Sequence, residues 1–165
     1  MGSFARTEGG LRVRLSGDEV EVLRRLASEL RALYDAEDDP VQTRLFPRAY
    51  LDPTQEESER EWQSLVHPEL RRDRLAALDT VVSTLERAAE RPSGREVVLT
   101  DEEPEAWLSL LNDARLALGT RLGVTDDTDL DAQRAAAGDD SEAAVYEVYG
   151  WLTWLQGDLV EVLMA

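Results

Sequence analysis

The sequence contains no cysteine, no lysine and no isoleucine, and His67 is its one histidine. Without a thiol, the chain has no disulfide, no thiolate metal site and no thiol redox chemistry. A single histidine excludes any metal cluster built from several histidines. All 18 basic residues are arginine. Carboxylates, arginines, amides and hydroxyls are therefore the polar groups that remain for function.

Basic residues are also few compared with acidic ones, because 35 aspartates and glutamates give the chain a net charge of −17. Nucleic acids and anionic membrane surfaces repel such a molecule, and binding through counterion release needs a basic patch. The only dense basic run is Arg71, Arg72 and Arg74, which Asp73 interrupts. We therefore expect protein partners, with no direct binding to nucleic acid and no membrane association.

The last stretch, Ala143 to Met164, predicts the helix around which the fold is organised. Its apolar residues fill about half of the helical circumference. They are Val145, Val148, Tyr149, Trp151, Leu152, Leu155, Leu159, Val160, Val162 and Leu163. Glu147, Asp158 and Glu161 occupy the other half, so this is not a membrane span. An apolar arc this wide needs neighbours on several sides, as at the centre of a bundle.

Two strand-to-helix units of similar pattern lie 84 positions apart. Leu11–Leu15 and Glu96–Leu99 have the pattern of short strands. Ser16–Glu19 and Thr100–Glu103 follow them as helix capping boxes. Because an isolated strand has no hydrogen-bond partners, we expect the two strands to pair into a small ribbon.

The region between these units predicts two helices separated by a break. Asp52 caps the first helix, which has Pro53 at its first position and runs to about Val66. His67 and Pro68 end it, and the second helix runs from Pro68 to about Glu90.

The predicted fold is all-α, with about five helices around the C-terminal helix and a minor two-stranded β ribbon. Residues 1–10 are polar and glycine-rich, which predicts a flexible arm. Residues 11–165 form a single helical domain in which the acidic segment at about 125–140 is a mobile loop. No signal sequence is evident, so we expect a cytoplasmic protein.

No motif in the chain predicts an enzyme. Asp127, Asp129 and Asp131 alternate like the first ligands of a calcium loop, but Ala132 stands where that loop requires glycine. His67 has no nucleophile elbow around it, and no glycine-rich phosphate loop exists. We therefore predict no catalytic residue, no metal site and no cofactor.

Polar residues on apolar helix faces are more informative. Arg121 and Gln156 both fall inside apolar arcs, and a buried arginine or glutamine is costly unless hydrogen-bonded. We predict that Asn112, Arg121, Gln156 and Tyr149 form an internal polar network. Two alternatives are a ligand pocket lined by these residues and a helix edge that is simply exposed. An exposed Arg121 without a protein acceptor would contradict the network.

Aromatic residues outside the predicted core are candidates for partner contact. Trp154 lies outside the apolar arc of the last helix, where it either packs under the acidic segment or belongs to an interface. Phe46 and Tyr50 lie in an apolar, proline-rich connector that we expect to dock on the core. Trp154 is the first candidate, followed by Phe46 and Tyr50.

Three segments resemble one known family: RLFPRAYLDP (Arg44–Pro53), LNDARLALGTRLGV (Leu111–Val124) and YGWLTWLQGDLVEVL (Tyr149–Leu163). The chain resembles an actinobacterial family of domains of unknown function that includes the AosR-type oxidative-stress transcriptional regulators. The resemblance implies a regulatory protein, with genes neighbouring those for the adaptor ClpS and for cysteine biosynthesis. It also implies oxidant sensing by a C-x-x-x-C pair together with a sigma factor, but this chain has no cysteine and cannot operate that switch.

The leading functional hypothesis is a non-enzymatic cytoplasmic regulator that acts in transcription through a protein partner, such as a sigma factor or another polymerase component. A direct DNA-binding regulator is the alternative, which requires that Arg12, Arg14, Arg71, Arg72 and Arg74 gather into one patch. An adaptor linked to ClpS-dependent proteolysis is a further alternative.

Overall fold

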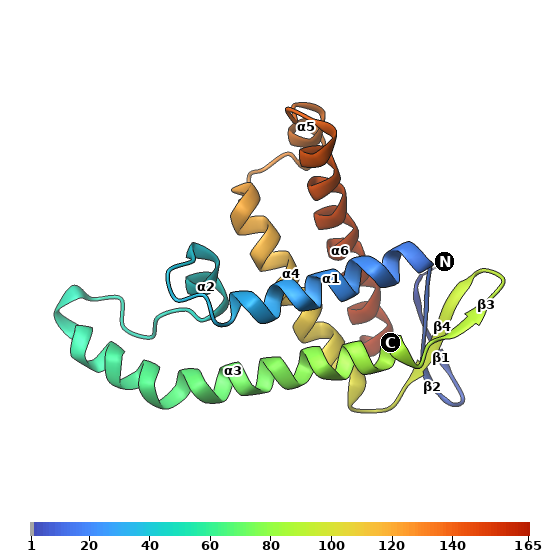
Figure 1. The fold of residues 1–165 in the computed structure, drawn as a ribbon, viewed down its shortest axis with the longest axis horizontal. Helices are drawn as coiled ribbons and strands as arrows, with labels where there is room; N and C mark the ends of the chain where they lie inside the picture. The colour runs from blue at the N-terminus through green and yellow to red at the C-terminus, as the bar shows by residue number, and fades with distance from the viewer. Residues whose placement is uncertain (1) are drawn as a thin grey trace.

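The computed structural model describes residues 2–165 (Figure 1). The helices are α1 (Gly17–Leu33), α2 (Pro40–Leu45), α3 (Glu56–Glu86), α4 (Glu103–Leu122), α5 (Leu130–Ala135) and α6 (Asp140–Met164), with a 3-10 turn, η1, at Pro53–Gln55. The strands are β1 (Phe4–Thr7), β2 (Gly10–Leu15), β3 (Ala89–Arg91) and β4 (Gly94–Leu99).

The four strands form one antiparallel sheet in the order β1-β2-β4-β3, so the prediction of an all-α fold with a two-stranded ribbon is wrong. The predicted central pairing is present, with Leu11 opposite Leu99 and Val13 opposite Val97. Each central strand also begins in a hairpin, and the outer hairpin strand satisfies backbone groups that a two-stranded ribbon would expose. Residues 4–7, inside the predicted flexible arm, form the outer strand β1.

The 84-residue repeat seen in the sequence extends to backbone geometry. Gly10 and Gly94 each open a central strand with a positive φ, 130° and 131°. Each approaches the last carbonyl of the opposite central strand, that of Leu99 for Gly10 and that of Leu15 for Gly94. Only glycine takes this conformation at low cost. The molecule therefore contains two hairpin–helix units, β1-β2-α1 and β3-β4-α4, which pair through their central strands.

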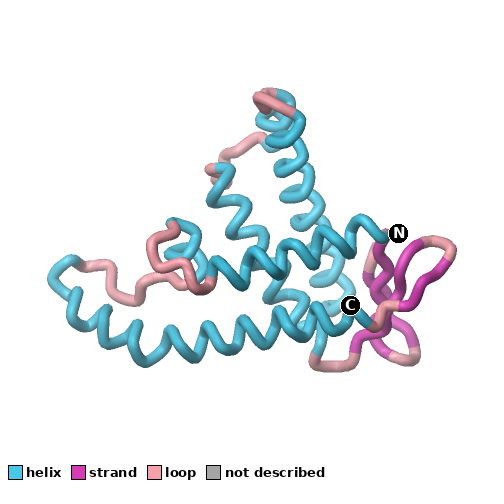
Figure 2. Tube along the Cα trace, viewed as in Figure 1, coloured by secondary structure: helices cyan, strands magenta, loops and turns pink. Residues whose placement is uncertain are grey.

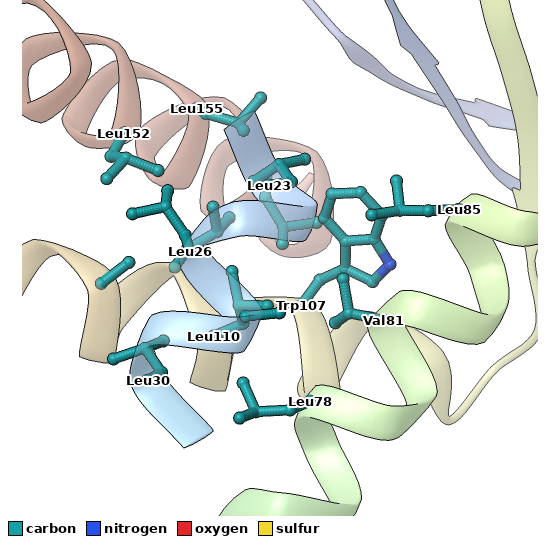
Figure 3. Packing of buried hydrophobic residues seen from close by; sticks show 14 of the residues in the cluster. Leu23, Leu26, Leu30, Leu78, Val81, Leu85, Trp107, Leu110, Leu152 and Leu155 are labelled. Atoms are coloured by element: carbon teal, nitrogen blue, oxygen red, sulfur yellow. The ribbon is translucent and has the colours of Figure 1, made fainter. Parts of the chain in front are cut away.

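The centre of the fold is α4, and not α6 as the sequence predicted, because α4 contacts α1, α2, α3 and α6. Trp107 of α4 is fully buried among leucines from α1, α3 and α6 (Figure 3). Its Nε1 donates to Thr84 Oγ1 at 3.1 Å, and its ring meets Phe4 of β1 edge to face. The apolar arc of α6 is instead shared between α4 on one side and β1 near its C-terminal end.

The break predicted at His67–Pro68 is absent, because α3 runs through Pro68 without interruption. Pro68 is exposed, so the carbonyl that loses its helical hydrogen bond is on the solvent side. The N-terminal half of α3 extends past the ends of the other helices (Figure 1).

The acidic segment between α4 and α6 contains a short helix of its own. α4 ends at Gly123, which has a left-handed φ of 67°. Asp129 then caps α5, which contacts α6 at the tip of the α4–α6 arm (Figure 2). Among residues 2–165, none of the helices combines the length and the apolar character needed to cross a bilayer.

Candidate functional site

The four residues predicted to form an internal network lie at separate places on the surface of the α4–α6 pair. Arg121 is exposed and donates to Asp39 Oδ2 at 3.2 Å, while Asn112 is also exposed. Gln156 accepts a hydrogen bond from Arg115, and Tyr149 lies against Gly119. Within residues 2–165, no hydrogen bond joins any two of the four. The structure therefore does not bring them together.

A different polar cluster is buried between α1, α3 and α4. Asp113 of α4 is 2% exposed. Its Oδ2 accepts from the hydroxyl of Tyr34 at 2.6 Å, and its two carboxylate oxygens accept from Arg74 Nη1 at 3.3 and 3.2 Å. Tyr34 ends α1 and Arg74 lies midway along α3. This cluster therefore fixes the register of three helices at one point.

Burial perturbs both titratable groups at the centre of this cluster. Desolvation raises the pKa of Asp113, although the hydrogen bond from Tyr34 and the charge of Arg74 act in the opposite direction. Desolvation, followed by the nearby charge of Asp113, also raises the pKa of Tyr34 far above its usual range. Tyr34 therefore remains a donor at every physiological pH.

Aromatic stacking connects the buried cluster to the surface. The guanidinium of Arg74 lies 4.7 Å from the centre of the Phe46 ring. That ring also meets Tyr34 edge to face at 5.7 Å and His67 at 4.4 Å. His67 borders an open groove of about 460 Å³ between α3 and the end of α1. The polar lining of the groove includes Gln42, Gln63, Ser64 and Arg71. The acidic side chains of Asp35 and Glu37 also line it, so the groove is polar and suits hydrogen bonding.

This cluster could hardly be predicted from the sequence. On α4, Asp113 lies only about 40° around the helix from buried Ala117, at the edge of the apolar face. That position alone does not distinguish a buried carboxylate from an exposed one. Arg74 stood in the basic run with Arg71 and Arg72, which favoured a surface role. The partners come from α1 and α3, so the pairing depends on the tertiary fold.

The predicted partner contacts differ in exposure. Phe46 is 4% exposed, so it docks on the core as the connector was expected to do. Tyr50 is 36% exposed, and its backbone amide is held by buried Glu59, whose Oε2 accepts it at 2.8 Å. Trp154 is 48% exposed on α6. Trp154 and Tyr50 are therefore accessible to a partner, whereas Phe46 is not.

The surroundings of Trp154 are unusually open for a helix face. Gly150 and Gly157 lie on the same side of α6, one turn before and about one turn after it. A Cβ added to either glycine would have no atom within 4 Å outside its own stretch of helix. On the adjacent side of α6, Arg115 Nε donates to Thr153 Oγ1 at 3.2 Å and ties the helix to α4. The indole therefore projects from a braced helix with bare backbone on both sides.

The basic residues do not gather into one patch. Arg12 and Arg14 lie on β2, whereas Arg71, Arg72 and Arg74 lie on α3. Each of the three on α3 is within ion-pair distance of a carboxylate: Asp35 for Arg71, Glu69 for Arg72 and Asp113 for Arg74.

In the acidic loop, Asp129 caps the short helix α5. Asp129 Oδ1 accepts from the Ala132 amide at 3.1 Å. In the part of the chain that the structure describes, no three histidine or carboxylate side chains are placed to hold a metal ion.

These features define an acidic α/β domain with a buried polar cluster at its centre and an exposed tryptophan on its last helix. The chain belongs to the family described as Domain of unknown function (DUF2017), whose model matches residues 1–163.

The chain is also similar to proteins named "Oxidative stress regulator AosR". It is 31% identical to that of Mycobacterium tuberculosis (strain ATCC 25618 / H37Rv) over 137 residues, which are 76% of this chain and 59% of the relative. The same values hold for the protein of that name from Mycobacterium bovis (strain ATCC BAA-935 / AF2122/97). The chain thus spans about three fifths of the length of these relatives. No solved structure matches it.

Proposed function

We propose that this protein is a cytoplasmic regulator of the oxidative-stress response that acts in transcription through a protein partner, docked on the face of α6 around Trp154. The partner class is a sigma factor or another component of the polymerase. The regulatory role is supported by the names of the relatives. The observation that carries the docking site is the half-exposed indole of Trp154 between two uncovered glycines.

Gly150 and Gly157 support the proposal because glycine makes a helix less stable. Each glycine inside a helix is about 1 kcal/mol less favourable than alanine, and the fold leaves room for a methyl group at both positions. Folding therefore gives no reason for Gly150 or Gly157. Close approach of a partner's backbone does, because bare helix surface lets a second chain lie against the indole. Tryptophan is also enriched among residues that dominate interface energies.

The absence of cysteine shapes the mechanism. An oxidant cannot be sensed here through a thiol, so this chain responds to a signal that its partner or another molecule receives. The net charge of −17 favours a basic docking surface on the partner, with fast association that weakens as salt rises.

The test is fluorescence anisotropy of the labelled protein with each sigma factor of the host, and separately with promoter DNA at low salt. We expect one sigma factor to bind. We expect Trp154→Ala to weaken that binding roughly thirtyfold, as at an interface hot spot. Leu65→Ala is the matched control, since Leu65 is an exposed apolar residue on α3. Unchanged binding by Trp154→Ala, or tight binding of promoter DNA by the protein alone, would refute the proposal.

A further inference from the structure

The outer face of the sheet is a second uncovered surface. The inner face packs on the core through Phe4, Leu11, Val13, Leu15, Val97 and Leu99. Alternate residues of the same strands point the other way. They are Ala5, Arg12, Arg14, Ala89, Arg91, Glu96 and Val98. The helices all extend to one side of the strands in Figure 2, so none of the helices in residues 2–165 covers this face.

This face is locally basic in a strongly acidic protein. It carries three arginines and one glutamate, a local charge of about +2 against −17 for the whole chain. Arg14 is paired with Glu96, donating from Nη2 at 2.8 Å. The hydrogen bond from Arg14 lowers the pKa of Glu96, and the charges of Arg12 and Arg91 lower it further, so both arginines lie within electrostatic reach of it.

Arg12 and Arg91 differ from Arg14 in having no ion-pair partner. Among residues 2–165, no carboxylate lies within 4.0 Å of either guanidinium. Arg12 lies opposite Val98 and Arg91 lies opposite Gly94, so the two arginines are offset by four residues along the strands and by two strand spacings across the sheet. Their Cα atoms are therefore about 16 Å apart. The same span separates residues 11 positions apart on one side of an α-helix, at about 1.5 Å of rise per residue.

The surface between the two arginines suits a packed helix. Val98 is 41% exposed on β4, next to Arg12. Glu96, whose charge is paired with Arg14, lies midway between Arg12 and Arg91. Ala5 flanks Arg12 on β1, and Ala89 flanks Glu96 on β3. The small side chains near Val98 form a shallow apolar surface against which small residues of a helix can pack.

We propose that the outer face of the sheet binds an acidic helix of a protein partner, with carboxylates about three turns apart that pair with Arg12 and Arg91 and small apolar residues that cover Val98. A nucleic acid fits less well, because a continuous phosphate chain would extend past the local positive charge into the acidic surroundings. A second copy of this chain fits less well for a related reason, since two molecules of charge −17 repel each other. The proposal stands apart from the docking site at Trp154.

The test is a titration of the ¹⁵N-labelled protein, followed by NMR, with an 18-residue alanine–glutamine helical peptide that has glutamates at positions 4 and 15. We expect shift changes on β2, β3 and β4 and a dissociation constant that rises with sodium chloride. The peptide with glutamine at both positions should not bind. Because an exposed ion pair is worth about threefold in affinity, Arg12→Gln together with Arg91→Gln should weaken binding about tenfold.

Arg60→Gln is the control variant, since Arg60 is an exposed arginine of α3. It should bind the acidic peptide as the unmodified protein does. Equal binding of the glutamate and glutamine peptides would overturn the proposal. Undiminished binding by the double variant, or tighter binding of a 12-nucleotide single-stranded DNA to the same strands, would also overturn it.

Discussion

The buried cluster of Tyr34, Arg74 and Asp113 permits a quantitative test of how α1, α3 and α4 are held together. The perturbation is Asp113→Ala. It removes an acceptor that is 2% exposed and leaves the Tyr34 hydroxyl, on a residue 1% exposed, without its partner. It also leaves Arg74, whose side chain is 25% exposed, without a counter-charge.

The expected loss of unfolding free energy follows from these contacts. A hydrogen bond to a charged acceptor contributes about 1.5–3 kcal/mol, and an orphaned buried hydroxyl costs about 1–3 kcal/mol more. The contribution of Arg74 is smaller because it is partly hydrated. Removing one partner of a buried pair costs about 3–5 kcal/mol in total. For a chain of 165 residues this lowers the melting temperature by about 6–20 °C.

Urea unfolding followed by far-ultraviolet circular dichroism measures the effect. Tyr34→Phe alone should cost about 1.5–3 kcal/mol. The double variant should cost less than the sum of the two single variants by a similar amount, because the orphaned hydroxyl is gone. Asp79→Ala is the control: Asp79 pairs with Arg31 at the surface, so its loss should cost at most about 1 kcal/mol. Additivity of the Tyr34 and Asp113 changes within about 0.5 kcal/mol would refute the reasoning.

The same carboxyl predicts a pH dependence. Burial raises the pKa of Asp113, so the native state holds its proton to a higher pH than the unfolded state does. The stability due to the protonated form is complete below the unfolded pKa and declines as pH rises through the folded pKa. The advantage of the unmodified protein over Asp113→Asn should therefore shrink as pH rises from about 4. An advantage that grows over this range in urea titrations would contradict this sign.

Four further substitutions test the rest of the fold. Pro68→Ala should stabilise the projecting half of α3 by up to about 3 kcal/mol, seen as slower amide exchange there, and faster exchange would contradict this. Gly94→Ala should destabilise the protein in urea unfolding, because the backbone at Gly94 has a φ of 131°. Gly157→Ala should stabilise it by about 1 kcal/mol, because the added methyl group meets no atom outside its own stretch of helix. The opposite order of stability would refute these readings of the two glycines. The hydrogen bond from Arg87 lowers the pKa of Glu103, so this ion pair stabilises the protein above about pH 4.3 and ceases to do so on acidification. Glu103→Gln should therefore lose less unfolding free energy than the unmodified protein as the pH falls. An equal loss in the two proteins would count against the ion pair.

The two docking surfaces that we propose differ in character. The face around Trp154 carries the indole, two glycines and the exposed carboxylates of Glu147 and Glu161, and it lies on a braced helix. The outer face of the sheet is basic and shallow. A protein that contacts one partner at each surface would link the two partners. The variants described above separate the surfaces, because Trp154→Ala leaves the sheet intact and Arg12→Gln leaves α6 intact.

Some features of the fold were predicted correctly from the sequence. The capping box predicted at Thr100–Glu103 was not among them, because α4 begins at Glu103 and only the Thr100 amide donates to Glu103. The capping box of Ser16 and Glu19 is present, with both hydrogen bonds formed. The pairing of Leu11–Leu15 with the Glu96–Leu99 strand is also present. These features depend on residues close together in the chain or on two strands with the same pattern. Short-range rules therefore suffice to predict them.

Other features depend on how helices that are distant in the chain pack together, and the sequence did not predict these. α3 continues through Pro68 because that position faces solvent, where water can satisfy the freed carbonyl. The fold centres on α4 because four helices pack on it, although α6 has the more continuous apolar sequence. Asp113 is buried because α1 and α3 cover it. Arg121 lies at the surface, where it pairs with Asp39 at the start of α2. Periodicity shows which face of a helix is apolar, but only the assembled fold determines where along that helix the face is covered.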